Sequence, residues 1–217
     1  MRYERKFPFK TSNLELMKAE IIKYGFFEAY KNRSVTSVYY DTQDFYLYNI
    51  SEYGIENREK KRIRWYNNSD DMQIEYKQKK SELGNKFIKE KNLNDCELIN
   101  LNLVGINDIK MLSKKIPSKL DSIYFPNVGV SYKRKYLESI CKRVRVTMDY
   151  DISFSRVFKI KENLSIQNWI PSENAVLEIK YESNILNVDL LINKFIVDFD
   201  LQFNRFSKYC QAVKICY

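Results

Sequence analysis

Alternation of charged and apolar side chains is the feature that most restricts how this 217-residue chain can fold. Successive side chains of a β-strand point to opposite faces, so a period of two predicts a strand with two unlike faces. The segment 61–66 places Arg62 and Arg64 on one face and Ile63 and Trp65 on the other. Strand-like segments rich in β-branched and aromatic residues occur at 34–40, 61–66, 72–79, 128–134, 142–149 and 176–181.

Five segments carry one ionic face each. These faces contain Arg2, Glu4 and Lys6; Arg62 and Arg64; Glu75, Lys77 and Lys79; Arg143, Arg145, Thr147 and Asp149; and Glu178 and Lys180. The simplest interpretation is an antiparallel sheet whose charged face lies in water. If the faces point inward instead, cations crowd, because two unit charges about 6 Å apart repel by about 3 kcal/mol at an effective dielectric of about 20. Such a sheet needs interspersed carboxylates, for which Glu4, Glu75 and Glu178 are suitably placed, and an anionic ligand, for which the planar arginine fork suits phosphate.

The helical signals lie mostly near the ends of the chain. Ser12 and Glu15 form a capping-box pattern that predicts a helix over 13–24, and Gly25 is a natural stop. Residues 98–120 are more helical than their surroundings and resemble an insertion between strands, and two further helices are expected near 188–197 and 204–214. Together these elements predict an α+β fold with an antiparallel sheet, and the absence of a linker predicts one domain over 1–217.

Composition excludes several kinds of chemistry. The chain has no histidine, which removes imidazole general bases, histidine-dependent nucleophiles and His-ligated zinc. Only five glycines leave little room for a glycine-rich phosphate loop. The net charge of +9 suggests a polyanionic partner, although it can also serve solubility alone. Four cysteines without a CxxC pair, a charged start and no apolar run of about 18 residues favour a cytoplasmic protein with reduced thiols.

Eight short motifs occur along the chain in a fixed order. They read RYERKF at 2–7, SVYYDT at 37–42, KRIRWY at 61–66, EYK at 75–77, VSYKRKY at 130–136, RVTMD at 145–149, LEIKY at 177–181 and FSKY at 206–209. In this order the motifs resemble the VTC domain, the polyphosphate polymerase branch of the triphosphate tunnel metalloenzymes. The resemblance implies an eight-stranded antiparallel β-barrel that forms a tunnel, with ionic faces inside and helices packed outside.

The resemblance also implies roles for individual residues. Catalytic cations are expected at Lys6, Arg62, Arg64, Arg134, Arg145 and Lys208, phosphate-binding residues at Lys77, Lys86, Lys180, Arg205 and Ser207, and the metal ligand at Glu178. Arg205 stands where the family has lysine, and Lys89 and Lys91 compete with Lys86 for its place. The lysines at 6, 86 and 180 can also be surface residues, and Ser207 can be a residue of a first helical turn.

The function implied is a polyphosphate polymerase that uses Mn²⁺ or Mg²⁺ to transfer the γ-phosphoryl group of ATP to a growing polyphosphate chain. Hydrolysing relatives begin with ExExK, and here Arg2 takes the place of the first glutamate, which removes a carboxylate that could hold a second metal. A triphosphatase and a non-catalytic polyphosphate-binding accessory protein stay open as alternatives. A nucleic-acid-binding barrel ranks low, because the arginines alternate within strands and no stacking motif is visible. A separate membrane protein that receives the polymer, and would hold the chain at the inner face of the membrane, is left open.

Overall fold

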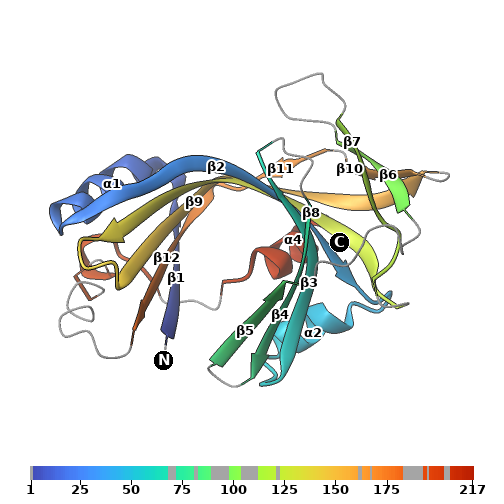
Figure 1. The fold of residues 1–217 in the computed structure, drawn as a ribbon, viewed down its shortest axis with the longest axis horizontal. Helices are drawn as coiled ribbons and strands as arrows, with labels where there is room; N and C mark the ends of the chain where they lie inside the picture. Colours follow the sequence, from blue (N-terminus) through green and yellow to red (C-terminus); the bar gives the residue numbers. More distant parts are fainter. Residues whose placement is uncertain are drawn as a thin grey trace. The chain divides into compact units, whose positions relative to one another are not determined.

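The computed structural model describes residues 2–67, 72–80, 83–88, 98–103, 112–120, 123–160, 163–166, 168–182, 193–194, 196–202 and 206–217. Its described strands form a twelve-stranded sheet with the order β5-β4-β3-β2-β8-β9-β10-β6-β7, in which β12 pairs with β1 and β9, and β11 with β9 (Figure 1). The strands are β1 Arg2–Lys10, β2 Phe26–Asp41, β3 Arg58–Tyr66, β4 Gln73–Lys80, β5 Leu83–Ile88, β6 Leu98–Leu103, β7 Leu112–Pro117, β8 Phe125–Ser139, β9 Val144–Ile160, β10 Asn163–Ile166, β11 Ile170–Pro171 and β12 Asn174–Glu182. The helices are the 3-10 helix η1 Thr11–Asn13 and the α-helices α1 Leu14–Lys23, α2 Tyr46–Glu52 and α4 Lys208–Cys216.

The sheet confirms the strand predictions but not the closed barrel. All six predicted segments lie in strands, although β9 begins only at Val144, after Lys142 with a φ of 58°. The sheet is mostly antiparallel, with a parallel pairing of β6 and β10. The expectation of an eight-stranded closed barrel with helices packed outside is wrong for the described residues. Nine strands follow a path with open ends at β5 and β7, β1, β11 and β12 lie off this path, and helices are few.

Helix α1 follows the prediction except at its start. It ends at Lys23, and Gly25 two residues later has a φ of 82°, in the left-handed region that glycine tolerates. The predicted capping box is wrong, because Ser12 belongs to η1 and the N-cap residue Asn13 makes no side-chain capping bond. The preceding 3-10 turn therefore starts this helix in place of a side-chain cap.

The predicted helical insertion over 98–120 is wrong, because its described residues form β6 and β7. Ile116 and Leu120 from this segment are fully buried against Ile63 and Trp65 of β3. Burial against a sheet overrode the local helical preference, which is weak at the level of single residues. Near the C-terminus, residues 193–194 and 196–198 are helical, while residues 188–192 lie outside the described part. Helix α4 overlaps the predicted second tail helix over 208–214 and continues to Cys216.

By its internal contacts the chain divides into two compact units. Strands β2, β8 and β9 each have one part in unit 1 and the other part in unit 2. Unit 1 consists of Met1–Ser34, Tyr132–Ile152 and Ser172–Phe206, and unit 2 of Val35–Ser131, Ser153–Pro171 and Ser207–Tyr217. The single domain over 1–217 stays a prediction. No helix in the described ranges is long and apolar enough to cross a bilayer.

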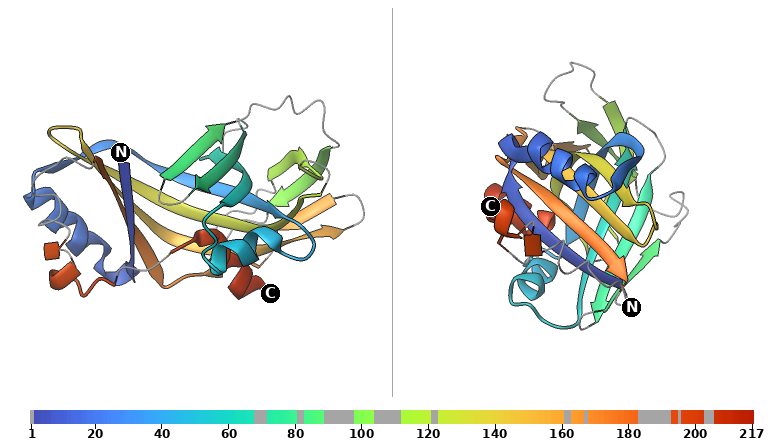
Figure 2. Two further views of the ribbon diagram at one scale, coloured as in Figure 1. Left: turned by 90° about the horizontal axis from the view of Figure 1, so that it is seen from below. Right: turned by 90° about the vertical axis from the view of Figure 1, so that its left-hand side faces the viewer.

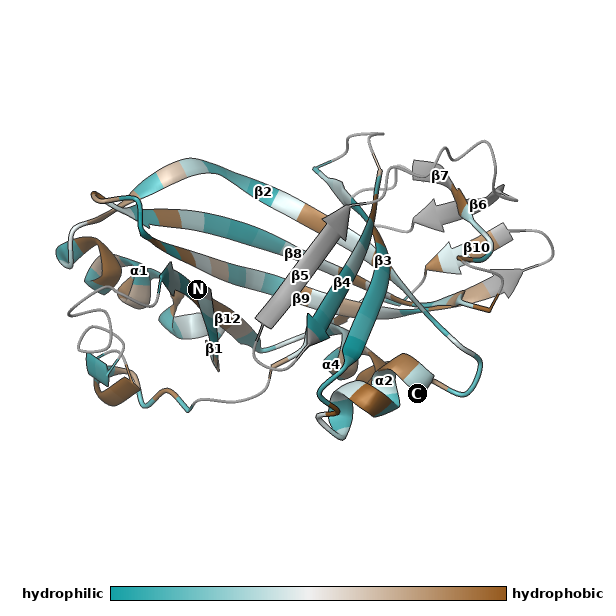
Figure 3. Ribbon diagram, turned by 60° about the horizontal axis from the view of Figure 1, so that its bottom comes forward, coloured by the Kyte–Doolittle hydropathy of each residue, from teal (hydrophilic) through white to brown (hydrophobic). Residues whose placement is uncertain are grey.

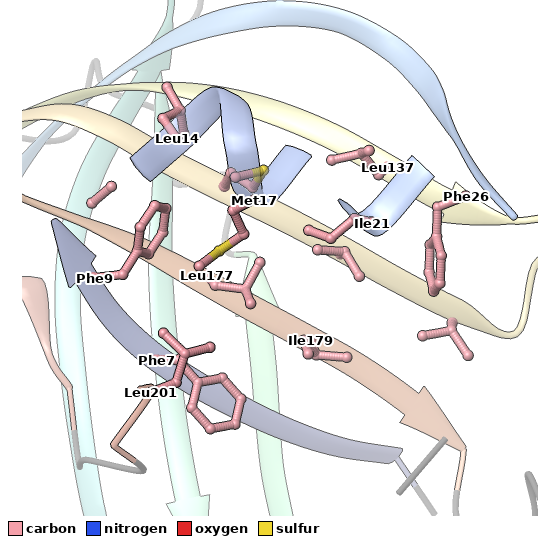
Figure 4. Packing of buried hydrophobic residues seen from close by; sticks show 14 of the residues in the cluster. Phe7, Phe9, Leu14, Met17, Ile21, Phe26, Leu137, Leu177, Ile179 and Leu201 are labelled. Atoms are coloured by element: carbon pink, nitrogen blue, oxygen red, sulfur yellow. The ribbon is translucent and has the colours of Figure 1, made fainter. Parts of the chain in front are cut away.

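In unit 1, α1 covers the apolar face of the strands (Figure 2). Met17 and Ile21 are fully buried and pack with Phe7 of β1 and with Leu177 and Ile179 of β12 (Figure 4). These strand residues are the ones that period two places opposite the charges, so α1 leaves the ionic face of unit 1 on the other side of the sheet.

In unit 2, hydrophilic residues predominate along β3 and β4 (Figure 3), and period two gathers the charges of Lys60, Arg62 and Arg64 on one face of β3. Their opposite, apolar face is buried through Ile63, Trp65 and Ile74. Helix α4 lies on the ionic side, since the Tyr209 ring stacks on Tyr39 with ring centroids 5.1 Å apart. The expectation that helices cover the apolar side therefore holds for α1 and fails for α4.

Asp41 at the end of β2 caps the start of α2 and links α4 to the strand. Its Oδ1 accepts from the backbone N–H of Leu47 at 2.8 Å, and its Oδ2 accepts from that of Tyr48 at 2.9 Å. The Tyr209 hydroxyl also donates to Asp41. One buried carboxylate thus satisfies the N-terminal donors of α2 and fixes α4 to the strand.

The α1 core of unit 1 gives a stability prediction. Met17→Ala should lower the free energy of unfolding by about 2–5 kcal/mol, because it opens a cavity at a fully buried site. Leu16→Ala, on the same helix but 60% exposed, should change it by no more than about 0.5 kcal/mol. Urea unfolding followed by circular dichroism measures both, and equal losses would contradict the packing of α1 on the strands.

Candidate functional site

Unit 2 places like charges opposite one another across its strands. Arg58 of β3 stands in register with Lys79 of β4, and Lys60 stands in register with Lys77. Lys77 in turn is the register partner of Lys86 on β5. Like charges directly opposite in a sheet are destabilising. The pairs Arg58–Lys79, Lys60–Lys77 and Lys77–Lys86 form the cationic rows of unit 2. Repulsion within these rows destabilises the sheet, and an anionic ligand would relieve it.

Beside these rows, Glu75 gathers the two arginines of the KRIRWY motif. Its Oε2 lies 2.7 Å from Arg62 Nε, 2.5 Å from Arg62 Nη2 and 3.6 Å from Arg64 Nη1. Arg64 Nε also donates to Ser37 Oγ at 3.0 Å. Glu75 is 1% exposed and Arg64 is also buried, so this ionic face is not a water-covered surface. The carboxylate that the sequence analysis expected between the cations is confirmed here.

Tyr39 also holds the guanidinium group of Arg62. Its hydroxyl accepts from Arg62 Nη1 at 2.8 Å. Burial raises the pKa of Tyr39, but the positive charges of Arg62, Arg64 and Lys60 outweigh this effect and lower the pKa to about 8. Burial and the neighbouring Asp41 raise the pKa of the stacked Tyr209 instead. Two adjacent tyrosines thus differ sharply in acidity, and only Tyr39 belongs to the cation cluster.

The start of α4 joins this cluster through Ser207. Ser207 is the N-cap residue, and its Oγ accepts from the backbone N–H of Cys210 at 3.2 Å. The same Oγ accepts from Lys60 Nζ at 2.6 Å. The helix-capping interpretation of Ser207 is confirmed, and Lys208 is the first residue of the helix. The sequence analysis missed Lys60, although period two along β3 places it on the face of Arg62.

Unit 1 carries a second cluster in which the charges alternate. Lys6 of β1 is in register with Glu178 of β12, and Glu4 is in register with Lys180. Glu178 lies 2.7 Å from Lys180 Nζ through Oε1 and 3.7 Å from Lys6 Nζ through Oε2. Glu4 lies 2.8 Å from Lys6 Nζ and 3.8 Å from Lys180 Nζ. Two carboxylates and two lysines therefore form a closed ring of ion pairs.

Two arginines extend this cluster. Arg134 binds Asp149 through Nε and Nη2, at 2.5 and 2.7 Å. Burial lowers the pKa of Arg134, but Tyr132, Asp149 and Glu178 raise it well above its ordinary value. Arg145 lies in register with Lys180, and its guanidinium contacts Glu138 at 3.4 Å. Arg134 is therefore held rigidly, whereas Arg145 is half-exposed.

Glu178 and its neighbours suit a divalent cation. Burial raises the pKa of Glu178, but Lys6, Lys180 and Arg134 outweigh it and hold the pKa well below its usual value, so the carboxylate is ionised. Its register partner Thr147 has a buried Oγ1 without a hydrogen-bond partner among the described residues, as expected of a group that meets a ligand. In the described part of the chain no three His, Cys, Asp or Glu side chains form a metal cage. Mg²⁺ does not need one, since it commonly binds one or two carboxylates together with substrate phosphates.

The predicted site residues thus divide between the units. Lys6, Arg134, Arg145, Glu178 and Lys180 lie on the ionic face of unit 1. Arg62, Arg64, Lys77, Lys86, Ser207 and Lys208 belong to unit 2, with Lys86 placed by its backbone alone. Arg205 lies outside the described residues. The expectation that all of them line one tunnel stays a prediction.

The Tyr39 environment gives a titration prediction. One tyrosine of the wild-type protein should ionise with a pKa of about 8, and Tyr39→Phe should remove it. Because the pKa is lowered in the folded state, the stability contributed by Tyr39 is full above the unfolded pKa of about 10 and is lost as pH falls through about 8. Tyrosinate absorbance measures the titration. Tyr53→Phe, at a highly exposed tyrosine, is the control, and a signal that survives Tyr39→Phe would contradict the assignment.

Comparisons with known proteins agree with the fold described above. HpAC1, a putative adenylyl cyclase of Hippeastrum described as having a dominant triphosphatase activity, is 10% identical over 100% of this chain and 97% of its own, with a TM-score of 0.53. A putative adenylate cyclase of Vibrio parahaemolyticus is 9% identical over 98% of both chains, with a TM-score of 0.51. These likenesses show a shared fold, and no curated protein sequence matches the chain. The family profile described as VTC domain matches residues 1–217, so this chain belongs to the VTC domain family.

Proposed function

We propose that this protein is a metal-dependent polyphosphate polymerase that transfers the γ-phosphoryl group of ATP to a growing polyphosphate chain. The observation that carries the proposal is the pairing of Lys60 with Lys77 and of Arg58 with Lys79 across β3 and β4. A sheet that sets cations against cations on an ionic face is stabilised by a ligand of high negative charge density. A triphosphate and a polyphosphate chain both have that character.

The arginines beside these rows suit the charge that develops during transfer. Phosphoryl transfer spreads negative charge over the oxygens around the moving phosphorus, and catalysis consists mainly of positioning and charge stabilisation. Arg62 is held by Glu75 and Tyr39, and Arg64 by Glu75 and Ser37. Side chains fixed in this way need little reorganisation when the phosphates arrive, which is the property that electrostatic catalysis requires.

Glu178, with Glu4 as its neighbour in the ring of ion pairs, is the group that would hold Mn²⁺ or Mg²⁺. A bound divalent cation would polarise phosphoryl oxygens and neutralise their charge. Lys6, Lys180 and Arg134 balance the charge of Glu178, so on this proposal they would contact phosphate oxygens when the carboxylate binds the metal.

The transfer balances without a general base. An oxygen of the terminal phosphate of the polymer forms a bond to the γ-phosphorus of ATP, while the bond from that phosphorus to the β–γ bridging oxygen breaks. ADP leaves with the bonding electron pair, and the polymer grows by one phosphate. The attacking oxygen is already ionised at neutral pH, so a chain without histidine loses nothing in this step.

A triphosphatase is the second candidate, favoured by the dominant triphosphatase activity described for HpAC1. Water is a weaker nucleophile than phosphate and needs a metal or a base to activate it. Arg2 in place of the first glutamate of ExExK removes one carboxylate that could take part in this activation. This substitution supports the polymerase over the hydrolase.

The product of ATP turnover is the first test. Purified protein with ATP and Mn²⁺ should form chains that migrate as a ladder on a polyacrylamide gel and disappear on treatment with a polyphosphatase. Release of free phosphate without chains would replace the polymerase by the triphosphatase. Binding of polyphosphate without any turnover would leave the accessory role.

The metal ligand is tested with Glu178→Gln. The variant should lose at least about a hundredfold in metal-dependent kcat, because several kcal/mol of charge stabilisation depend on the bound cation. ATP binding measured without metal should be retained, since Lys6, Lys180 and Arg134 remain. Glu173→Gln, at an exposed glutamate that pairs with Lys10, is the matched control and should keep full activity. Wild-type turnover in Glu178→Gln would exclude Glu178 as the metal ligand.

A further inference from the structure

A cavity of about 220 Å³ lies within unit 2 where β3 begins and β4 ends, beside α2. Its lining combines an aromatic ring, two carboxamides, two cations and one carboxylate. The lining residues that carry these groups are Tyr46, Asn57, Arg58, Glu59, Gln78 and Lys79, and Ile50 completes the lining. None of them was assigned a role in phosphate or metal binding by the sequence motifs.

The cavity continues the cationic rows of the candidate site. Arg58 and Lys79 are a register pair, and the next pair on the same face is Lys60 with Lys77. Arg58 and Arg62 are four residues apart along β3, which corresponds to about 13 Å of strand. A ligand that reaches from the cavity to Arg62 therefore has the length of a nucleotide with several phosphates, not of a single phosphate group.

The chemistry of the lining differs from that of the rows. The Tyr46 ring is 53% exposed and lies on the first residue of α2, where it offers a flat face for stacking. Asn57 and Gln78 present amide donors and acceptors of the kind that recognise base edges. Glu59 lies between Arg58 and Lys60 along β3. Its carboxylate is 3.4 Å from Lys61 Nζ and accepts from the Tyr124 hydroxyl at 3.3 Å, so its charge is compensated within the protein.

A plain phosphate chain fits this lining less well. It would use Arg58 and Lys79, of which Arg58 is anchored by donating to the Ile55 carbonyl at 2.9 Å. It would gain nothing from the Tyr46 ring and would meet the carboxylate of Glu59. A nucleoside fits the lining better, because its base can stack on Tyr46 and form hydrogen bonds with the carboxamides, and its first phosphate can lie near Arg58 and Lys79.

We propose that this cavity binds the nucleoside of a nucleoside triphosphate whose phosphates extend along β3 toward Lys60, Lys77 and Arg62. The inference rests on the proposed function, because it takes these cations as the triphosphate site. It adds that the protein distinguishes a nucleotide from inorganic triphosphate by contacts outside the phosphates.

Calorimetric titration with two ligands tests the proposal, using an ATP analogue with an imido β–γ bridge and inorganic triphosphate. Tyr46→Ala should weaken binding of the analogue about tenfold, since an aromatic ring stacked on a base contributes on this scale. Binding of inorganic triphosphate should stay within about twofold of the wild-type value. Tyr46→Phe keeps the ring and should bind both ligands as the wild type does.

Tyr53→Ala is the matched control, since Tyr53 follows α2, is 81% exposed and does not line the cavity. It should leave both affinities unchanged. If Tyr46→Ala weakens both ligands equally, or neither, the nucleoside site is overturned while the triphosphate site stands. If the wild-type protein binds neither ligand, the proposed function fails and the nucleoside site fails with it.

Discussion

The ionic faces of this sheet depend on buried carboxylates that hold cations together. Glu75 is 1% exposed and joins Arg62 to Arg64, and Glu178 is 7% exposed and joins Lys6 to Lys180. Removing one partner of a buried ion pair typically costs about 3–5 kcal/mol, because the remaining charge stays buried. The same residues therefore maintain the strand pairing and set the electrostatics of the proposed site.

The two clusters use charge in different ways. In unit 1 the lysines and glutamates alternate in register, so the ring of Glu4, Lys6, Glu178 and Lys180 is neutral as a group. In unit 2 the carboxylate Glu75 serves two arginines, and the lysines of β3 and β4 face each other. A neutral ring with exchangeable partners suits a metal that displaces a lysine from a carboxylate. A row of cations in register suits phosphates. The division follows from where carboxylates occur along strands of period two.

Much of the site could be predicted from the sequence because alternation along a strand is a local property. The opposite faces of 61–66 follow from the letters alone, and so does Lys60, which the same rule places beside Arg62. Register and the choice between helix and strand for 98–120 could not be predicted, because both depend on residues distant in the sequence, such as Trp65, which buries Ile116 and Leu120. The position of α4 was missed for the same reason. The stacking of Tyr209 on Tyr39 fixes the position of α4. The two residues are far apart in the sequence, and the sequence around either one does not show that they meet.

The protonation states of the clusters bear on which nucleophile the site favours. Hydrolysis needs a group that accepts a proton from water, and a useful base has a pKa near the working pH. Asp149 and Glu178 are each bound to cations, and the pKa of Glu178 is held far below that range. Tyr39 has a pKa of about 8, but its oxygen is committed to Arg62. An acceptor phosphate arrives already ionised and needs none of these groups as a base. Under the proposed function, the cations that would hold polyphosphate also make Glu178 a poor base. Both effects would favour transfer between phosphates over transfer to water.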